Sequence, residues 1–492
     1  MRSIRIVVLL VSMSVMVLWA KAQTNLAFYS LENQFNSSNF NPAFLISQNN
    51  FSFSIFPMGG TSIGYNNQQV IKQLVLKVLS GISTDQDYKD MLKSMADHNF
   101  IHQNIESALL NIIFRSKVGV FNFRIKEVES FSAAFKGDLS DFIFKDGIQS
   151  AVINQSQNMP AQFIHYREYS LGYSLTTRNN KFFAGIRPKI YFGKSAFFSG
   201  ISGIIIPDQA GEYVLNTGGK VKLSFPLNAM NVNGQNTDVN SGFKGSKAIS
   251  YLMNSGNPGI GVDLGINYRI NPGLTLSMSV IDLGKIYWNK NLNSKSFNGQ
   301  HNFKGSVYPG YNKAGDEIIT KTDGSYSFID TISTKLDLKI DSSAFSRPMP
   351  ITVFTGLKYQ INPSLKISIV DRYIILKNLN YNSFSILANF DINKKLSVSS
   401  GYSIIGNSYK NIPLALLFKR DFGQIYVGTD NLLAFVLPSI SDFAGFSFGT
   451  CFYLFKNRNL AHTDSKGYPF YSSKKSKKSK KTGRIRKNYQ EF

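Results

Sequence analysis

The feature that most constrains this chain is a repeated hairpin unit, built from long segments in which apolar and polar residues alternate. Tyr268–Ser277 has the sequence YRINPGLTLS, Tyr359–Ser368 has YQINPSLKIS, and Phe390–Ser399 has FDINKKLSVS. Each copy places an Asn-Pro or Asn-Lys pair between two alternating segments. Asn-Pro favours a turn because Pro presets φ and excludes the preceding residue from the helical region. We therefore expect antiparallel hairpins along much of the chain.

The length of the alternation indicates what these strands face. Residues 264–270 place Leu, Ile, Tyr and Ile on one side and Gly, Asn and Arg on the other. Period-two alternation over about 10 residues exceeds the usual soluble strand of about 5–6 residues and suits a tilted strand across a bilayer. Tyr268, Tyr359 and Phe390 precede their turns, where an interfacial aromatic girdle is expected. The alternative is a large soluble β-sandwich with one buried face per strand.

Composition favours one large barrel over two or three soluble domains. The chain has 492 residues, of which 17% are charged and 13% aromatic, whereas soluble domains are about 25% charged. The predicted fold class is an all-β membrane protein, a closed antiparallel transmembrane β-barrel of about fourteen strands (fourteen to sixteen) with short helical inserts. Cys451 is the one cysteine, which excludes an internal disulfide and a cysteine zinc cluster.

The first 22 residues have the pattern of a secretory signal peptide. Arg2 and Arg5 precede an apolar run over residues 6–19, and Ala20-Lys21-Ala22 matches a cleavage site. We expect the mature chain to begin at Gln23. The rest of the sequence has no apolar run long enough for a spanning helix. Export without spanning helices, together with long amphipathic strands, predicts the outer membrane of a Gram-negative bacterium.

Residues 23–50 are rich in Asn and Phe and contain Asn41-Pro42-Ala43 just before the first predicted strand. This motif resembles that of the fatty-acid-transporter-like outer-membrane barrels. The resemblance implies that residues 23–50 fold inside the barrel as a hatch, with Asn41, Pro42 and Ala43 as its motif. The alternative is an ordinary turn outside the barrel.

Other segments define the expected organisation of the barrel over residues 51–455. Helical spacing predicts an insert of about 67–103 that packs over the rim. A polar stretch of about 289–348 predicts a long outer loop with its own hairpin near residues 326–338. Short turns on one rim and longer connections on the other would distinguish the periplasmic side from the outer side.

Four further segments resemble one family. These are Arg167–Tyr173, Gly261–Gly265, Ile281–Gly284 and Gln424–Asn431. They are similar to an uncharacterised family of Bacteroidota outer-membrane barrels, distantly similar to the fatty-acid-transporter-like and type IX secretion-associated barrels. The resemblance extends over about residues 41–455. It implies the fold and supplies no catalytic or ligand-binding residue.

Strand parity assigns several charged residues to the interior, because Arg or Lys facing lipid at mid-depth costs about 2–4 kcal/mol. Such a lining could select an anionic or amphiphilic solute. The same charges could instead pair across a closed lumen and hold the barrel together, and we favour this structural interpretation. The lumen-lining candidates are Glu168, Arg187, Lys189, Asp263, Arg269 and Lys358.

Signals for an enzyme are poor, and we expect no catalytic residue, no cofactor and no metal. The 5 His residues are scattered and form no H-E-x-x-H pattern. The nearest pairing for a lipase-like site is His165 with Ser170. Their odd spacing puts them on opposite faces of a strand, so we reject it.

The last segment, residues 456–492, is expected to be a basic disordered tail that includes Lys474–Lys481. Export makes nucleic acid an improbable partner. In the periplasm such a tail could contact anionic phospholipid headgroups, the cell wall or an acidic protein, or it could simply be solvated.

Together these observations predict an outer-membrane barrel with a hatch that passes small hydrophobic or amphiphilic solutes, with membrane lipid around it. The alternative is a barrel that transports nothing and serves as a structural or assembly component of a secretion or cell-surface machine. A lipid-modifying enzyme is a distant third.

Overall fold

The computed structural model describes most of the chain between residues 26 and 454. The described residues are 26–31, 34–44, 51–67, 98–116, 118–136, 157–177, 179–207, 213–225, 251–303, 337–376, 380–406, 408–437 and 441–454. The predicted signal peptide, the helical spacing over residues 68–97 and the basic tail lie outside these residues. No helix within these ranges is long and apolar enough to cross a membrane.

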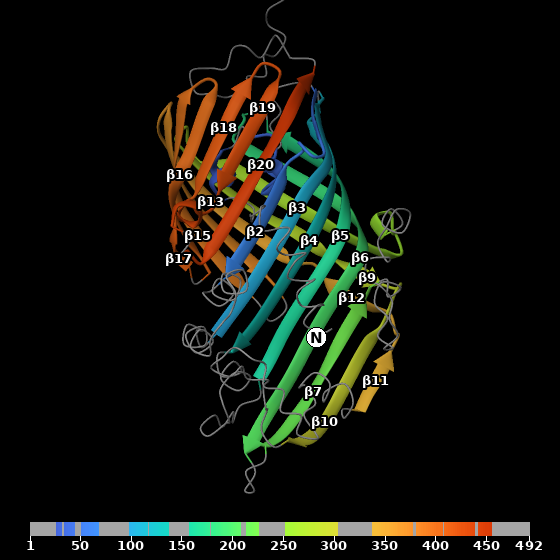
Figure 1. The fold of residues 1–492 in the computed structure, drawn as a ribbon. Coiled ribbons are helices and arrows are strands. Elements are labelled where there is room, and N and C mark those ends of the chain that lie inside the picture. Colours follow the sequence, from blue (N-terminus) through green and yellow to red (C-terminus); the bar gives the residue numbers. More distant parts are fainter. Residues whose placement is uncertain are drawn as a thin grey trace, which may run out of the picture.

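The described strands form one antiparallel sheet that closes on itself (Figure 1), and its wall has fourteen positions. At three of these positions, two shorter strands follow one another and share one place in the wall. In order, the wall strands are β1 (Phe51–Ile55) with β2 (Thr61–Asn67), β3 (His98–Arg115), β4 (Val120–Lys136), β5 (Gln157–Thr176), β6 (Phe182–Pro207), β8 (Asn257–Arg269), β9 (Leu274–Trp288), β12 (Phe345–Pro348) with β13 (Ile351–Asn362), β14 (Leu365–Ile375), β15 (Tyr381–Asn393), β16 (Leu396–Ile405), β17 (Ser408–Asn411) with β18 (Leu414–Arg420), β19 (Gly423–Thr429) and β20 (Phe443–Leu454).

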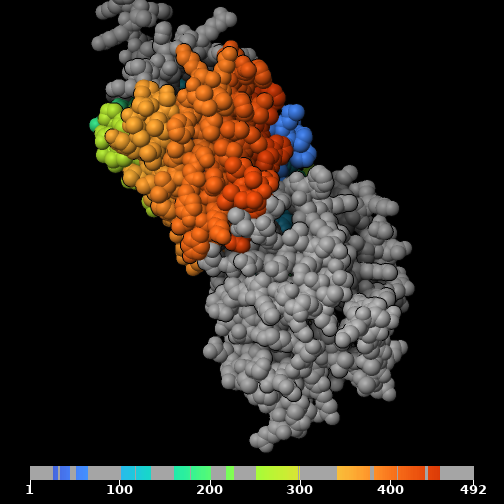
Figure 2. Space-filling view, turned by 60° about the vertical axis from the view of Figure 1, so that its left-hand side comes forward, coloured from blue at the N-terminus to red at the C-terminus, as the bar shows by residue number. Residues whose placement is uncertain are grey.

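The first and last wall strands close the barrel. β1 pairs with the end of β20 at Phe51↔Leu454, and β2 pairs with its start at Asn66↔Phe443. On their other side both pair with β3. Figure 2 shows the blue N-terminal strand beside the red C-terminal strand on the outer surface. This closure confirms the predicted closed antiparallel β-barrel of about fourteen strands. The described wall strands leave no exposed sheet edge around the ring.

Alternation along the strands separates an exposed apolar exterior from a buried interior. On β8, the exposed Ile260, Leu264 and Ile266 alternate with the buried Asp263 and Asn267. Exposed Leu, Ile, Phe and Tyr recur on the outward face of most wall strands, and soluble proteins rarely expose such continuous apolar surface. The exterior is therefore suited to lipid, and the sandwich alternative is wrong because the sheet closes instead of stacking. On the outward face of β14, the half-buried Asp371 is a polar residue among these apolar side chains.

The two rims differ in their connections. Short turns join β3 to β4, β5 to β6, β8 to β9, β13 to β14, β15 to β16 and β18 to β19, all on the rim where β1 begins and β20 ends. Asn271, Asn362 and Asn393 each accept hydrogen bonds from the two backbone N–H groups that follow in their turns. The predicted Asn-Pro and Asn-Lys turns are thus present in the structure. Except from β14 to β15 and from β16 to β17, the connections on the other rim are longer, and α8 (Leu433–Val436) also lies there.

The wall is extended beyond this second rim by a smaller sheet. The end of β6 pairs with β7 (Tyr213–Ser224), β7 pairs with β10 (Ser294–Phe303), and β10 pairs with β11 (Asp337–Asp341). In Figure 1 these strands project past the barrel. Part of the expected outer loop over residues 289–348 is therefore strand, while most of its expected hairpin lies outside the described residues.

The expected helical insert over residues 67–103 needs a correction at its end. Residues 98–103 belong to β3, where His98–Gln103 pairs with Phe131–Lys136 of β4. Strands β3–β6 are the longest of the wall, and pairing with β4 extends β3 toward the second rim through these residues. The helical spacing is a local pattern, so it could not show that residues 98–103 would pair with β4 in the folded sheet.

Candidate functional site

Three short helical turns from the N-terminal segment lie inside the barrel. They are α2 (Leu26–Ser30), η2 (Ser37–Asn39) and η3 (Pro42–Phe44), and we call residues 26–44 the inner segment. Every described residue of α2 is buried. The sequence explains this placement because the segment combines closely spaced Phe, Tyr and Leu with small polar residues that can bond to a wall.

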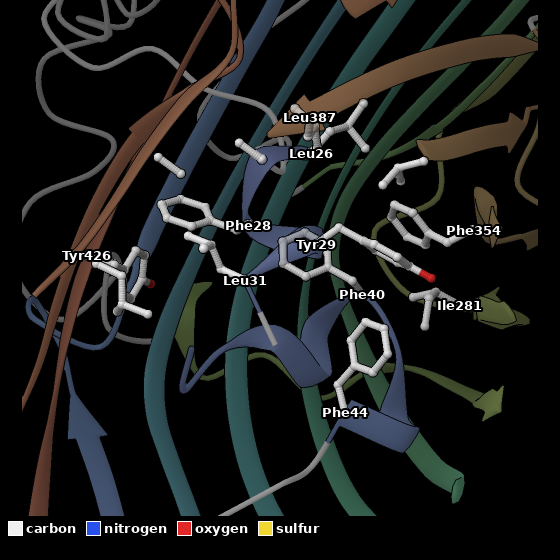
Figure 3. Packing of buried hydrophobic residues seen from close by; sticks show 14 residues of the cluster. Leu26, Phe28, Tyr29, Leu31, Phe40, Phe44, Ile281, Phe354, Leu387 and Tyr426 are labelled. Carbon is white, nitrogen blue, oxygen red and sulfur yellow. The ribbon is translucent and has the colours of Figure 1, made fainter. Parts of the chain in front are cut away.

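The inner segment forms an apolar cluster with the barrel wall (Figure 3). Tyr29 stacks on Phe354 of β13 with ring centroids 5.4 Å apart, and Phe28 meets Tyr426 of β19 edge-on at 5.1 Å. Phe40 packs edge-on against the same Phe354 ring at 5.9 Å. The interior at this level therefore holds an apolar cluster to which the inner segment and inward side chains of the wall both contribute.

The Asn41-Pro42-Ala43 motif rests against a flat part of the wall. Asn41 Nδ2 donates to the carbonyl oxygens of Ile266 on β8 (3.0 Å) and Met278 on β9 (3.2 Å). Gly185 of β6 and Gly265 of β8 are paired in register at this point. A Cβ on Gly185 would overlap Pro42 and Ala43, and a Cβ on Gly265 would overlap Asn41. The motif therefore needs this glycine pair as its seat.

Polar contacts hold the inner segment at several other points. Leu26 N donates to Asp430 Oδ1 at 2.7 Å, and Phe35 N donates to Gln424 Oε1 at 2.9 Å. Ser30 Oγ lies 3.0 Å from Ser399 Oγ of β16. Side-chain to side-chain and side-chain to backbone bonds of this kind are individually modest, about 0.5–1.5 kcal/mol each. The segment is thus held by many small contacts spread around the wall.

Four of the six predicted lumenal residues come together in one buried ion network. Lys189 Nζ lies 3.2 Å from Glu168 Oε2 and 2.8 Å from Asp263 Oδ1, and Arg187 Nη1 lies 3.2 Å from Asp263 Oδ2. All four side chains are almost completely buried. Buried charges need such partners because their desolvation is costly.

Four further residues complete the network, and sequence reasoning did not select them. Arg124 Nη2 lies 2.6 Å from Glu168 Oε1, and Lys126 Nζ lies 3.1 Å from Glu106 Oε2. Asp282 Oδ1 accepts from Lys189 Nζ at 2.6 Å and from Tyr191 at 2.9 Å. The network thus balances four cations against four carboxylates.

A β-bulge turns Asp282 toward this network. Val262↔Leu283 and Leu264↔Val280 are paired, so Ile281 and Asp282 of β9 together oppose Asp263. Asp282 has φ 62°, and its backbone N–H donates to Asp263 Oδ1 at 2.8 Å. An extra residue in one strand shifts the alternation, so both Ile281 and Asp282 point inward.

The network also contacts the inner segment. Arg187 Nη2 donates to the carbonyl oxygen of Ser38 at 2.6 Å, and Arg124 Nη1 donates to the side-chain oxygen of Asn39. The ion network and the apolar cluster therefore both contact the same segment.

The remaining two predicted lumenal residues lie elsewhere. Arg269 is half-buried at the short-turn rim, with its guanidinium 5.9 Å from the Phe183 ring centroid. Lys358 lies on β13, half-buried on the inward face with Phe354 and Gly356. Parity assigned both to the inward face but could not show that they lie away from the network.

No set of three or more possible metal ligands occurs among the described residues. His165 is half-buried on the outward face of β5, where its ring bonds to Glu127 and Tyr251, whereas Ser170 is buried on the inward face. The pair that sequence analysis rejected is therefore also separated in the structure.

These features define a class: a closed β-barrel with a lipid-type exterior and an interior filled by its own N-terminal segment. Residues 42–430 match the model of a family described as "Family of unknown function (DUF5723)", and the chain belongs to this family. No match was found among curated proteins.

Solved structures similar to this chain include toluene and monoaromatic hydrocarbon channels and a FadL homologue. The Ralstonia pickettii toluene transporter TbuX is 9% identical, with 85% of this chain and 92% of that chain covered at a TM-score of 0.35. A Pseudomonas aeruginosa FadL homologue is 10% identical, with 85% and 93% covered at 0.37. A mutant of the monoaromatic hydrocarbon channel TodX is 9% identical, with 84% and 92% covered at 0.37.

Proposed function

We propose that the protein is an outer-membrane channel in which residues 26–44 act as a hatch, and that it passes small hydrophobic or amphiphilic solutes. The observation that carries the proposal is the apolar cluster between the inner segment and the wall. If the segment moves, Phe354, Tyr426 and their neighbours line an apolar space suited to a hydrophobic solute. The short turns then face the periplasm and the extended sheet faces outward.

The contacts of the inner segment are compatible with movement. Apart from the charged bonds that Arg124 and Arg187 donate to Asn39 and Ser38, they are many and small. Asn41 bonds to carbonyl groups of the wall that already belong to a sheet. Losing such contacts one after another requires no strand of the barrel to unpair. A gating motion limited to this segment is therefore less costly than opening the wall.

A disulfide lock tests the proposal. Ser30 Oγ and Ser399 Oγ lie 3.0 Å apart, a separation that Ser30→Cys/Ser399→Cys can bridge with a disulfide. The variant is built with Cys451→Ser to remove the native thiol. We expect oxidation to abolish uptake of toluene and lauric acid into liposomes containing the protein, and a reductant to restore it.

A second disulfide supplies the matched control. Ser385 and Ser403 are paired on β15 and β16, with hydroxyl oxygens 2.6 Å apart. Ser385→Cys/Ser403→Cys therefore links two wall strands without restraining the hatch, and uptake should persist when it is oxidised. Equal uptake through the locked and unlocked hatch would exclude a gating role for residues 26–44.

One observation favours a second candidate function, a structural or assembly role without transport. Each charged side chain of the buried network has an opposite charge within 3.5 Å, as expected for a permanently closed lumen. A barrel of this kind would show no uptake in either disulfide variant under reducing conditions. It would instead co-purify with a stoichiometric protein partner.

A further inference from the structure

The sheet that extends the wall carries a row of side chains on the face that continues the barrel interior. Gly200 of β6, Lys220 of β7, Ser296 of β10 and Lys339 of β11 lie opposite one another across the four strands. Phe198 pairs with Lys222 in the neighbouring row. Phe198 is buried in the same apolar cluster as the inward-facing Trp288, which identifies this face as the inner one.

Two cations are held on this face by aromatic rings. Lys222 Nζ lies 5.0 Å from the centroid of Phe345, and the Arg347 guanidinium lies 4.7 Å from the centroid of Phe198. The two rings meet edge-on, with centroids 6.0 Å apart. An aromatic face attracts a cation without neutralising it. We call Lys220, Lys222, Lys339 and Arg347 the basic face.

The basic face differs from the lumenal network and from the group around Glu127 in its charge balance. In the lumenal network and around Glu127, lysines and arginines pair with carboxylates. Lys220, Lys222 and Arg347 form no ion pair with any residue that the structure describes. Three cations lie close together here without carboxylates of their own, so an anionic ligand is the complementary partner.

β11 carries two acidic residues beside this face, Asp337 and Asp341. Asp341 pairs with Ser294 at the end of β11 and is exposed. Hydrogen bonds from Ser343 hold the pKa of Asp341 below its ordinary value, and the charges of Lys222 and Lys220 act in the same direction. The charges of these lysines thus act on Asp341 without forming an ion pair with it.

The space beside the cations suits a flat polar ligand. A Cβ built on Gly200 meets nothing within 4 Å, and Ser296 and Gly218 on the next strands are also small and only partly covered. Lys220 and Lys222 are about 7 Å apart along β7, and Lys220 and Lys339 about 10 Å apart across β10, by strand geometry. A sheet face with small residues and spaced cations matches a chain of hydroxyl-rich units that carry regularly spaced acid groups.

We infer that the basic face binds an anionic saccharide, a sugar chain bearing carboxylate or sulfate groups. Lys220, Lys222 and Arg347 meet the acid groups, and Ser296 and Asn298 face the sugar hydroxyls. The bidentate guanidinium of Arg347 adds orientation that lysine alone does not supply. This binding site is separate from the hatch and does not depend on solute passage.

The test uses the full-length protein in detergent and two probes, dextran sulfate and alginate, with neutral dextran of equal length for comparison. We expect both acidic probes to bind and neutral dextran not to bind, with affinity falling as salt rises. Lys222→Gln/Arg347→Gln should weaken binding roughly tenfold or more, because it removes two of the three cations that meet the acid groups. Asp341→Asn should strengthen binding because it removes an exposed carboxylate near these cations.

The matched control removes two cations at the opposite rim. Lys394 and Lys395 are exposed in the turn between β15 and β16, and Lys394→Gln/Lys395→Gln changes the net charge by the same amount. Equal weakening by both double variants would overturn the inference, because it would indicate non-specific charge attraction. If Lys222→Gln/Arg347→Gln does not fold, the exposed Lys220→Gln should still weaken binding.

Polyaspartate of matched charge distinguishes the class of partner. Binding as tight as that of alginate would replace the saccharide by an acidic polypeptide and overturn the assignment. Absence of binding to both acidic probes at low salt would also overturn it.

Discussion

Lys189 shows how one lumenal side chain joins several wall strands. Its Nζ contacts Glu168 of β5, Asp263 of β8 and Asp282 of β9 at 3.2, 2.8 and 2.6 Å. Period-two alternation predicted its inward direction because β6 is regular there. Its partners depend on the register between strands, such as Arg187↔Asp263, and register is not readable from one strand alone.

Lys189→Met should destabilise the barrel strongly. The variant leaves the partly buried Asp282 without a cation and removes one cation each from the buried Glu168 and Asp263. Breaking a buried pair costs about 3–5 kcal/mol. Lys366→Met is the matched control, since Lys366 pairs with Asp391 at 3.1 Å in a partly exposed site, and such pairs contribute about 0–1 kcal/mol. The measurement is the thermal unfolding transition in detergent by circular dichroism. Similar transitions for the two variants would mean that the network contributes little to stability.

At the scale of elements, the strands were predictable and one irregularity was not. The polar face of β9 runs through Thr275, Ser277 and Ser279, so regular alternation places Ile281 inward and Asp282 outward. The bulge brings both inward and shifts every later residue, so that Ile286 and Trp288 are the buried ones. The signal in the sequence is the apolar Ile281 in a polar row, but one such residue does not identify a bulge.

The position of the inner segment is also an element-scale property. Asn41-Pro42-Ala43 suggested a hatch through resemblance, while the reason for its placement is the glycine pair on β6 and β8. Those glycines belong to strands far from the motif in sequence. The sequence therefore showed the motif but could not show that the motif would pack against Gly185 and Gly265.

Gly265→Ala should loosen the inner segment without unfolding the wall. The added methyl group would overlap Asn41, and overpacking of this kind costs about 1–3 kcal/mol. Gly273→Ala is the control because its Cβ would meet other atoms only at ordinary contact distances of 3.6 Å or more. Limited proteolysis in detergent should cleave the region of residues 26–44 faster in Gly265→Ala than in Gly273→Ala or the parent. Equal cleavage rates in all three would show that the glycine seat does not retain the segment.

At the scale of the whole molecule, the outward charges on β4–β6 indicate how deep the barrel lies in lipid. Glu127 contacts His165 at 2.9 Å, Arg167 at 2.7 Å and Lys194 at 3.2 Å on the outward face. The stretch from Arg167 to the end of β5 rises roughly 23 Å when the strand is tilted by about 40°, close to the apolar band of about 25 Å in outer-membrane barrels. The parts of β3–β6 nearest the second rim, together with the extended sheet, therefore lie outside the hydrocarbon.

Spin labels at outward positions test this depth. Leu171 and Ile190 are exposed and lie between the charged group and the short-turn rim, whereas Ser199 lies beyond the charges on β6. Labels on Leu171→Cys and Ile190→Cys, with Cys451→Ser, should collide mainly with dissolved oxygen, which concentrates in lipid. A label on Ser199→Cys should collide mainly with a water-soluble nickel chelate. If the label at Ser199 collided mainly with oxygen, the hydrocarbon would extend past Glu127 toward the extended sheet. The ion pairs of Glu127 would then lie in lipid, where charged side chains are costly. Water-type collisions at Leu171 and Ile190 would contradict a membrane location altogether, because the exposed apolar rows would then face water.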